Sequence, residues 1–138
     1  MKDMLIHAHS GLRWLVLLLL ILTLVQSLRN RSTGSNGKLP LYTLIASHLQ
    51  ALLGLTLYFL SSYVQFHGAM MKDKLLRFYT VEHSSMMLIA IVLITIGYSK
   101  SKKSENSAKT LLIYYGIAFL LILLAIPWPF RGLHAGWF

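Results

Sequence analysis

Four long apolar runs separated by short polar segments dominate the pattern along the chain. They cover about residues 6–28, 41–64, 76–98 and 110–128. A helix that crosses a bilayer needs about 20 apolar residues, and each run reaches that length. None of the runs alternates with the two-residue period of a half-buried strand. The pattern predicts an all-α integral membrane protein, a single transmembrane domain over residues 1–138 that folds as an up-down four-helix bundle.

The composition strengthens the membrane interpretation. The chain has 138 residues, of which 56% are hydrophobic and only 12% are charged. Soluble domains carry about 25% charged residues, and a small domain has too much surface to cover with so few polar groups. We therefore expect lipid to solvate most of the surface. The sequence contains no cysteine, which excludes disulfides, Cys-ligated zinc, iron–sulfur clusters and covalent attachment of c-type haem.

The formal charge of +9 is distributed between the apolar runs rather than in one patch. In such positions basic residues act as topology signals and contact anionic lipid headgroups. No basic patch with interleaved aromatic residues is present in the sequence, which argues against a nucleic-acid partner. The expected partners are the lipid bilayer and a larger membrane complex or further copies of the chain.

An even number of crossings places both termini and the 65–75 link on one side of the membrane, which we call face A. The 29–40 and 99–109 loops then share the other side, face B. The basic residues of face B are Arg29, Arg31, Lys38, Lys100, Lys102, Lys103 and Lys109. Face A has the basic residues Lys2, Arg13, Lys72, Lys74, Arg77 and Arg131, of which Arg13 and Arg77 lie within helix ends, and it also has the acidic Asp3, Asp73 and Glu82. We therefore expect face B to be cytoplasmic and both termini to be periplasmic.

Five of the six histidines gather in the half of the bundle near face A. They are His7, His9, His67, His83 and His134. Ionisable groups at membrane depth are costly and usually face the bundle interior, so each is a candidate functional residue. The structural alternative for each is an ordinary hydrogen bond between helices.

His9 and His83 are the sharpest pair, because helix rise places them at the same depth to within about one turn. A haem b held by two imidazoles needs ligands on opposing helices at similar depth, a flat cavity and basic groups for its propionates. Arg13 lies one turn below His9, and Arg77 lies nearer the surface of the third helix. Both arginines are candidate propionate partners, because a guanidinium pairs bidentately with a carboxylate.

Two other histidines are further candidate ligands. His7 is an alternative to His9, although the two-residue offset points it to nearly the opposite side of the helix. His48 lies towards face B, and its vertical offset of roughly 14 Å from His83 makes it a poorer partner. The stacked pairs of histidines found in dihaem cytochromes are absent from the sequence, so at most one haem is expected.

A second hypothesis uses the residues of face A as a copper or zinc site. Its candidate ligands are His7, His9, His67, His83, His134 and Glu82, near Met70, Met71, Met86 and Met87. Imidazole suits both metals and thioethers favour Cu(I), although paired methionines in a membrane helix are usually packing residues.

Glu82 has two interpretations of its own: pairing with Arg13 or Arg77, or proton transfer to a quinone.

Four segments of the chain also resemble a known family. They are HAHSGLRW at 7–14, TVEH at 80–83, IGYSK at 96–100 and IPWPFRGL at 126–133. Together they are similar to a family of small bacterial four-helix membrane proteins commonly labelled cytochrome b-like, and the resemblance covers nearly the whole chain. It implies a haem-binding protein of the bacterial inner (cytoplasmic) membrane, with His9 and His83 at matching positions.

We therefore expect an electron carrier of b-type cytochrome character, or a haem-bearing subunit of a larger complex. The alternative is a non-catalytic accessory subunit whose polar residues form hydrogen bonds between helices.

Overall fold

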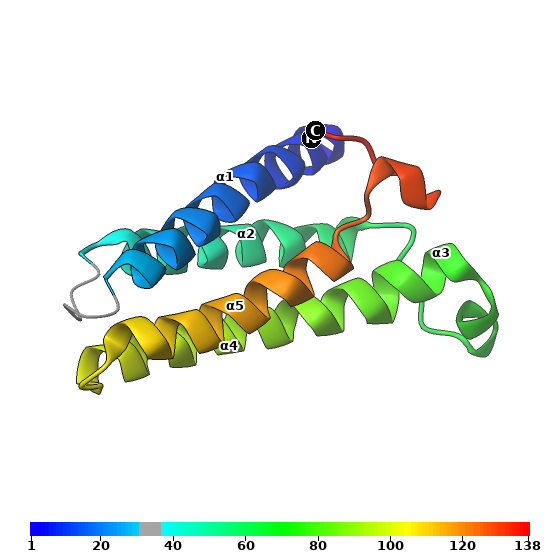
Figure 1. Cartoon of the computed structure of the whole chain (residues 1–138). Helices are drawn as coiled ribbons and strands as arrows, with labels where there is room; N and C mark the ends of the chain where they lie inside the picture. The colour runs from blue at the N-terminus through cyan, green and yellow to red at the C-terminus, as the bar shows by residue number, and fades with distance from the viewer. Residues whose placement is uncertain (31–36) are drawn as a thin grey trace.

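The computed structural model describes residues 1–30 and 37–138, and its long helices run side by side along one axis (Figure 1). They are α1 (Lys2–Arg29), α2 (Leu39–Leu60), α4 (His83–Lys103) and α5 (Ser107–Ala125). The short helix α3 (Lys74–Arg77) and the π-helix η2 (Phe78–Glu82) lead directly into α4 and extend it to a single segment, Lys74–Lys103. Two 3-10 turns, η1 (Gly68–Lys72) and η3 (Pro129–Arg131), complete the fold.

Within residues 1–30 and 37–138, four helical segments are long and apolar enough to cross a membrane. The expected all-α four-helix bundle is confirmed, and the chain is a multi-pass membrane protein.

The first two helices differ at one end from the sequence expectation. α1 was expected from residue 6 but begins at Lys2, with Asp3 in its first turn, where a carboxylate interacts favourably with the helix dipole. The second helix was expected over 41–64 but ends at Leu60, because Ser61 adopts an extended conformation. The expected boundaries followed apolarity, which does not report these local backbone choices.

The third helix is longer than the expected 76–98 at both ends and covers Lys74–Lys103. Its extension at face B carries Lys100, Lys102 and Lys103 in the last turn. Cations at a helix C-terminus are stabilised by the helix dipole. The basic segment after residue 98 therefore continues as helix, although its low hydropathy predicted a loop.

The fourth helix, expected over 110–128, is displaced towards face B. Asn106 caps its start, where the side-chain oxygen accepts a hydrogen bond from the backbone amide of Lys109 at 3.0 Å. The helix ends before Ile126, which is extended. The residue that precedes a proline is pushed out of the helical region, and Pro127 follows directly.

The helices form a four-membered ring in which neighbours in space are α1–α2, α2–α4, α4–α5 and α5–α1. α1 and α4 therefore face each other across the diagonal. The closest approach is between α4 and α5, where a Cβ added to Gly97 would lie 2.5 Å from the Cβ of Tyr114. Small residues allow membrane helices to approach in this way.

The interior combines apolar side chains with a few satisfied polar ones. Leu20, Ile94 and Tyr115 are fully buried. The hydroxyls of Thr23 and Thr43 share a hydrogen bond of 2.8 Å between α1 and α2. Hydrogen bonds of this kind hold neighbouring helices together. They matter in a membrane because lipid is as apolar as the helix surfaces, so the hydrophobic effect does not drive the helices to associate.

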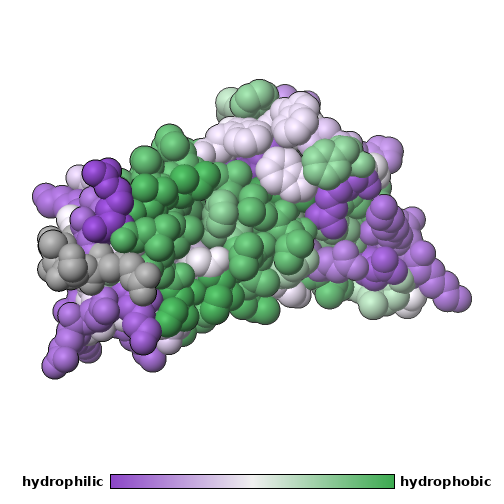
Figure 2. All heavy atoms as spheres, in the orientation of Figure 1, coloured by the Kyte–Doolittle hydropathy of each residue, from purple (hydrophilic) through white to green (hydrophobic). Residues whose placement is uncertain are grey.

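The outer surface is apolar over the middle of the molecule. Figure 2 shows a broad hydrophobic band between two hydrophilic ends. Leu88 and Leu124, for example, are 65% and 64% exposed. A band of this kind suits contact with acyl chains.

The two ends of the bundle match the expected faces. Both termini lie at the same end (Figure 1), as four crossings require. This end is face A, and it also contains the end of α2, all of α3 and the segment after α5. Face B contains the end of α1, the start of α2 and the turn between α4 and α5. Arg31, expected among the basic residues of face B, lies outside the described residues.

Candidate functional site: a histidine pair near face A

His9 of α1 and His83 of α4 meet across the diagonal of the bundle. Their ring centroids are 6.4 Å apart and the ring planes are inclined at 76°. When one metal ion joins two imidazoles, two bonds of about 2 Å plus roughly 1 Å from each nitrogen to its ring centre separate the centroids by about 6 Å. The separation of His9 and His83 would therefore allow both imidazoles to hold one metal ion. The depth match expected from helix rise agrees with this contact.

His83 is held in one orientation by the end of α5. Its Nδ1 donates a hydrogen bond of 2.7 Å to the backbone oxygen of Ala125, the last residue of that helix. The last four carbonyls of a helix have no partner within the helix, so Ala125 is free to accept. With the proton on Nδ1, the lone pair of Nε2 is available to bind a metal ion. Metal-ligating histidines are commonly oriented by a backbone carbonyl in this manner.

The π-helix η2 directly precedes His83 and changes which residues face the interior. Its wider turn shifts the register of the following helix relative to a regular α-helix, and π-helical turns occur often at functional sites. Phe78 and Thr80 in this turn are buried, and the Phe78 ring lies 5.7 Å from that of His83. The Thr80 carbonyl accepts a hydrogen bond of 3.0 Å from the hydroxyl of Tyr58 on α2. Sequence reasoning missed both Tyr58 and Thr80, because no composition signal marks a π-helical turn.

His9 is positioned by α2. The side-chain amide of Gln50 donates a hydrogen bond of 2.8 Å to the backbone oxygen of His9. The His9 ring lies against Gly54, where an added Cβ would be 3.0 Å from Cε1. The absence of a side chain at Gly54 therefore makes the space that the imidazole occupies. The sequence alone gave no role to Gln50.

The Nδ1 atom of His9 is buried and has no hydrogen-bond partner among the described residues. The Oε1 atom of Gln50 is likewise buried and has no hydrogen-bond partner among the described residues. Buried polar atoms without partners are unusual in proteins and suggest a missing ligand or ion. The unpartnered nitrogen of His9 is consistent with a residue that would bind a further group.

Arg13, one turn from His9, is directed to the C-terminal segment. It is 8% exposed, and its Nη2 donates hydrogen bonds to the backbone oxygens of Trp137 at 2.6 Å and Gly136 at 3.5 Å. The indole of Trp14 donates to the same Trp137 oxygen at 2.8 Å. The chain end is thereby fastened over the start of α1. Sequence reasoning had no signal for these partners, because they are main-chain carbonyls.

Arg77 pairs with Glu82. The Nε of Arg77 lies 2.9 Å from Oε1 of Glu82, and both side chains are about 40% exposed, at 38% and 40%. Nη1 of Arg77 also donates to the backbone oxygen of Met71 at 3.0 Å. One of the two interpretations of Glu82, pairing with a nearby arginine, is thus observed. The propionate roles of Arg13 and Arg77 stay predictions.

The other histidines do not join the pair. His7 and His134 are exposed, and His134 has a left-handed backbone with φ of 58°. His67 is exposed and contacts the side chain of Gln65 at 2.6 Å. Within residues 1–30 and 37–138 there is no group of three His, Asp or Glu side chains arranged to hold a metal ion. The copper or zinc hypothesis, which needs several ligands from face A, therefore gains no support from this geometry.

His48 lies in the half of the bundle near face B, as expected from helix rise. Its Nδ1 donates to the backbone oxygen of Leu44 at 2.8 Å, and its Nε2 lies 3.4 Å from the hydroxyl of Thr95 on α4. Both His48 and Thr95 are exposed on the outer surface of the bundle. This histidine is therefore separate from the pair and lies on the outer surface of the bundle.

The geometry defines the class as a small multi-pass four-helix membrane protein with two imidazoles in contact inside the bundle. No family model, no curated protein and no solved structure matches the chain.

Proposed function

We propose that the chain is a b-type cytochrome-like membrane protein in which His9 and His83 would hold one haem b. In this proposal it serves as an electron carrier or as the haem-bearing subunit of a larger membrane complex. The observation that carries the proposal is the 6.4 Å separation of the two imidazole centroids across the bundle. The resemblance to cytochrome b-like proteins supports the same two residues.

The residues around the pair suit two histidines that would hold a haem. The Ala125 carbonyl holds His83 with Nδ1 protonated and Nε2 free, and His9 has a buried nitrogen without a partner. Gly54 leaves the space that the His9 ring occupies, and Gln50 fixes the backbone of His9 against α2. When bound, haem b supplies a one-electron redox couple. The chain contributes ligation, orientation and an apolar surrounding that keeps water away from the iron.

The position of the histidine pair in the bundle suggests which groups a bound haem would contact and exchange electrons with. Arg13 and Arg77 lie at the face A end and are the proposed propionate contacts; Arg13 would exchange its bonds to the chain-end carbonyls for a carboxylate. Because the pair lies within the membrane spans, the proposed electron partner is a lipid-soluble quinone or a neighbouring membrane subunit. The excess of basic residues on face B supports a cytoplasmic face B and periplasmic termini, in the bacterial inner membrane.

A second candidate function is that of an accessory subunit. Exposed polar side chains at membrane depth are costly, and the outer surface between α2 and α4 displays His48 and Thr95. Contact with a transmembrane helix of another subunit or another copy would cover these groups. Native gel electrophoresis of gently solubilised membranes tests this: a larger complex that is lost in His48→Leu favours the accessory role, and a monomer argues against it.

Haem stoichiometry tests the first proposal. The protein is purified in mild detergent from cells supplied with haem, and its haem is measured as the pyridine haemochrome for wild type, His9→Ala, His83→Ala and the matched control His48→Ala. We expect one haem for each chain in wild type and His48→Ala, and none in the other two variants. Size-exclusion profiles confirm that each variant is folded. Equal haem content in all four proteins would refute the assignment of the ligands.

A further inference from the structure

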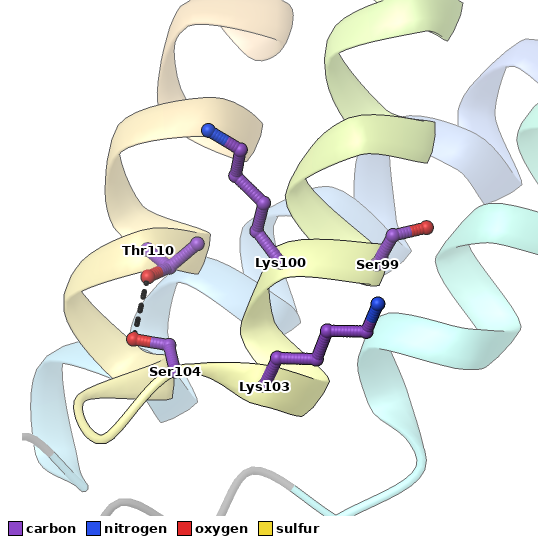
Figure 3. Close-up of a pocket in the computed structure, with 5 residues that line it drawn as sticks. All are labelled: Ser99, Lys100, Lys103, Ser104 and Thr110. Carbon is purple, nitrogen blue, oxygen red and sulfur yellow. Dashed lines mark hydrogen bonds between the residues drawn. The ribbon is translucent and has the colours of Figure 1, made fainter.

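A basic pocket lies at face B, where α4 ends and α5 begins (Figure 3). Its volume is about 330 Å³, it opens to the surroundings, and it is lined by Ser99, Lys100, Lys103, Ser104 and Thr110. His83 begins α4 and Lys103 ends it, so the full length of that helix separates the pocket from the histidine pair. The pocket therefore belongs to a different site.

The turn between α4 and α5 fixes the positions of the Ser104 and Thr110 hydroxyls on one side of the pocket. The Ser104 hydroxyl oxygen accepts hydrogen bonds from the Thr110 hydroxyl at 3.1 Å and from the Asn106 backbone amide at 3.2 Å. Asn106 in turn caps α5. Figure 3 shows the bond between Ser104 and Thr110 joining the two helices beside the lysines. The pocket is thus preorganised by hydrogen bonds on one side.

The positive charge of the pocket is not neutralised by the protein. The ammonium group of Lys103 makes no hydrogen bond or ion pair with the described residues, and that of Lys100 lies 5.5 Å from the ring centre of Tyr114. Lys102 is directed elsewhere, over the ring of Tyr98 at 4.6 Å. No carboxylate lines the pocket; the nearby Glu105 lies exposed on the turn.

We propose that this pocket binds the phosphate group of an anionic phospholipid. Two ammonium groups without an acidic partner supply the charge. The Ser104 hydroxyl, whose oxygen is held by Thr110, keeps its own proton to donate to a phosphate oxygen. The pocket lies at the boundary of the membrane span, and the exposed Ile113 on α5 lies one turn deeper. Acyl chains would contact this apolar surface, which a free phosphate ion would not use. Basic pockets between transmembrane helices bind anionic headgroups in this way.

The experiment counts retained lipid molecules by native mass spectrometry. The protein is reconstituted in nanodiscs of phosphatidylcholine with phosphatidylglycerol and then released in mild detergent. The variant Lys100→Gln/Lys103→Gln is compared with Lys38→Gln/Lys109→Gln, which removes the same charge from face B outside the pocket. Thr110→Val removes a hydroxyl without changing the charge. A parallel sample contains inorganic phosphate as competitor.

The pocket variant is expected to lose phosphatidylglycerol affinity by roughly 30-fold, since each basic residue near an anionic surface changes binding about fivefold. The control pair is expected to retain the lipid, and Thr110→Val to lose several-fold. Equal loss in both double variants would overturn the proposal and leave only diffuse surface charge. Unchanged retention in the pocket variant would overturn it as well. Displacement by inorganic phosphate would assign the site to a free anion and overturn the lipid assignment.

Discussion

The contact between Gly54 and His9 gives the most specific prediction about the histidine pair. In Gly54→Ala the new Cβ would lie 3.0 Å from Cε1 of His9, and 3.7 and 3.8 Å from its two ring nitrogens. Carbon atoms in contact are separated by about 3.5–4.0 Å, so the ring must move away by about 0.5 Å or more. A ligand site tolerates about 0.5 Å of displacement, so the substitution acts at that limit.

The energetic cost follows from this displacement. Forcing the His9 side chain off its preferred rotamer costs of order 0.5–1.5 kcal/mol. Alanine also replaces glycine within α2, which stabilises the helix by about 1 kcal/mol. The bundle should therefore remain folded while the affinity for haem falls by roughly two- to thirteenfold.

Haem titration into the apoprotein in detergent measures this effect. Gly11→Ala is the matched control, because it makes the same substitution in α1, close to His9, with no atom within 4 Å of the added Cβ. Its haem affinity should equal that of wild type. If Gly54→Ala binds haem as tightly as both, the His9 ring does not carry the role proposed for it.

Two further predictions concern the packing of the bundle. Gly97→Ala places a Cβ 2.5 Å from the Cβ of Tyr114, which cannot move without the backbone of α5. We expect this overpacking to cost about 1–3 kcal/mol of stability and to lower the melting temperature in detergent. The control Gly116→Ala has open space around the added Cβ and should not lower the melting temperature. An unchanged melting temperature in Gly97→Ala would contradict the close approach of α4 and α5. For the buried pair Thr23 and Thr43, a double-mutant cycle with valine should give a coupling energy of about 0.6 kcal/mol, and at most about 1.7 kcal/mol, by unfolding in denaturing detergent. A coupling of zero would show that the hydrogen bond is absent.

The transmembrane fold could be predicted from the sequence because lipid imposes a simple constraint. Long apolar runs have one stable form in a membrane, so the four spans were correct. Depth along a helix is also fixed by a constant rise, which is why His9 and His83 could be paired before any contact was known. Helix ends were less predictable, because Ser61 and Asn106 act through backbone conformation and capping rather than hydropathy.

The surroundings of the pair were less accessible to sequence reasoning. Arg13 binds the backbone oxygen of Trp137, and main-chain carbonyls are the same for every residue type. Gln50 contacts the backbone of His9, which likewise leaves no signal in residue identities. The π-helical turn before His83 depends on tertiary hydrogen bonds such as that from Tyr58 to Thr80. These contacts arise only when the helices are assembled.

The central claim is that His9 and His83 together ligate one haem. A reduced-minus-oxidised visible spectrum of the purified protein tests it directly, with His9→Ala, His83→Ala and His48→Ala measured beside wild type. The account predicts the narrow α band of a low-spin b-type haem in wild type and His48→Ala, and its loss when either member of the pair is removed. A featureless spectrum of the haem-supplied wild type, purified with any associated subunits retained, would contradict the account and favour the accessory-subunit function.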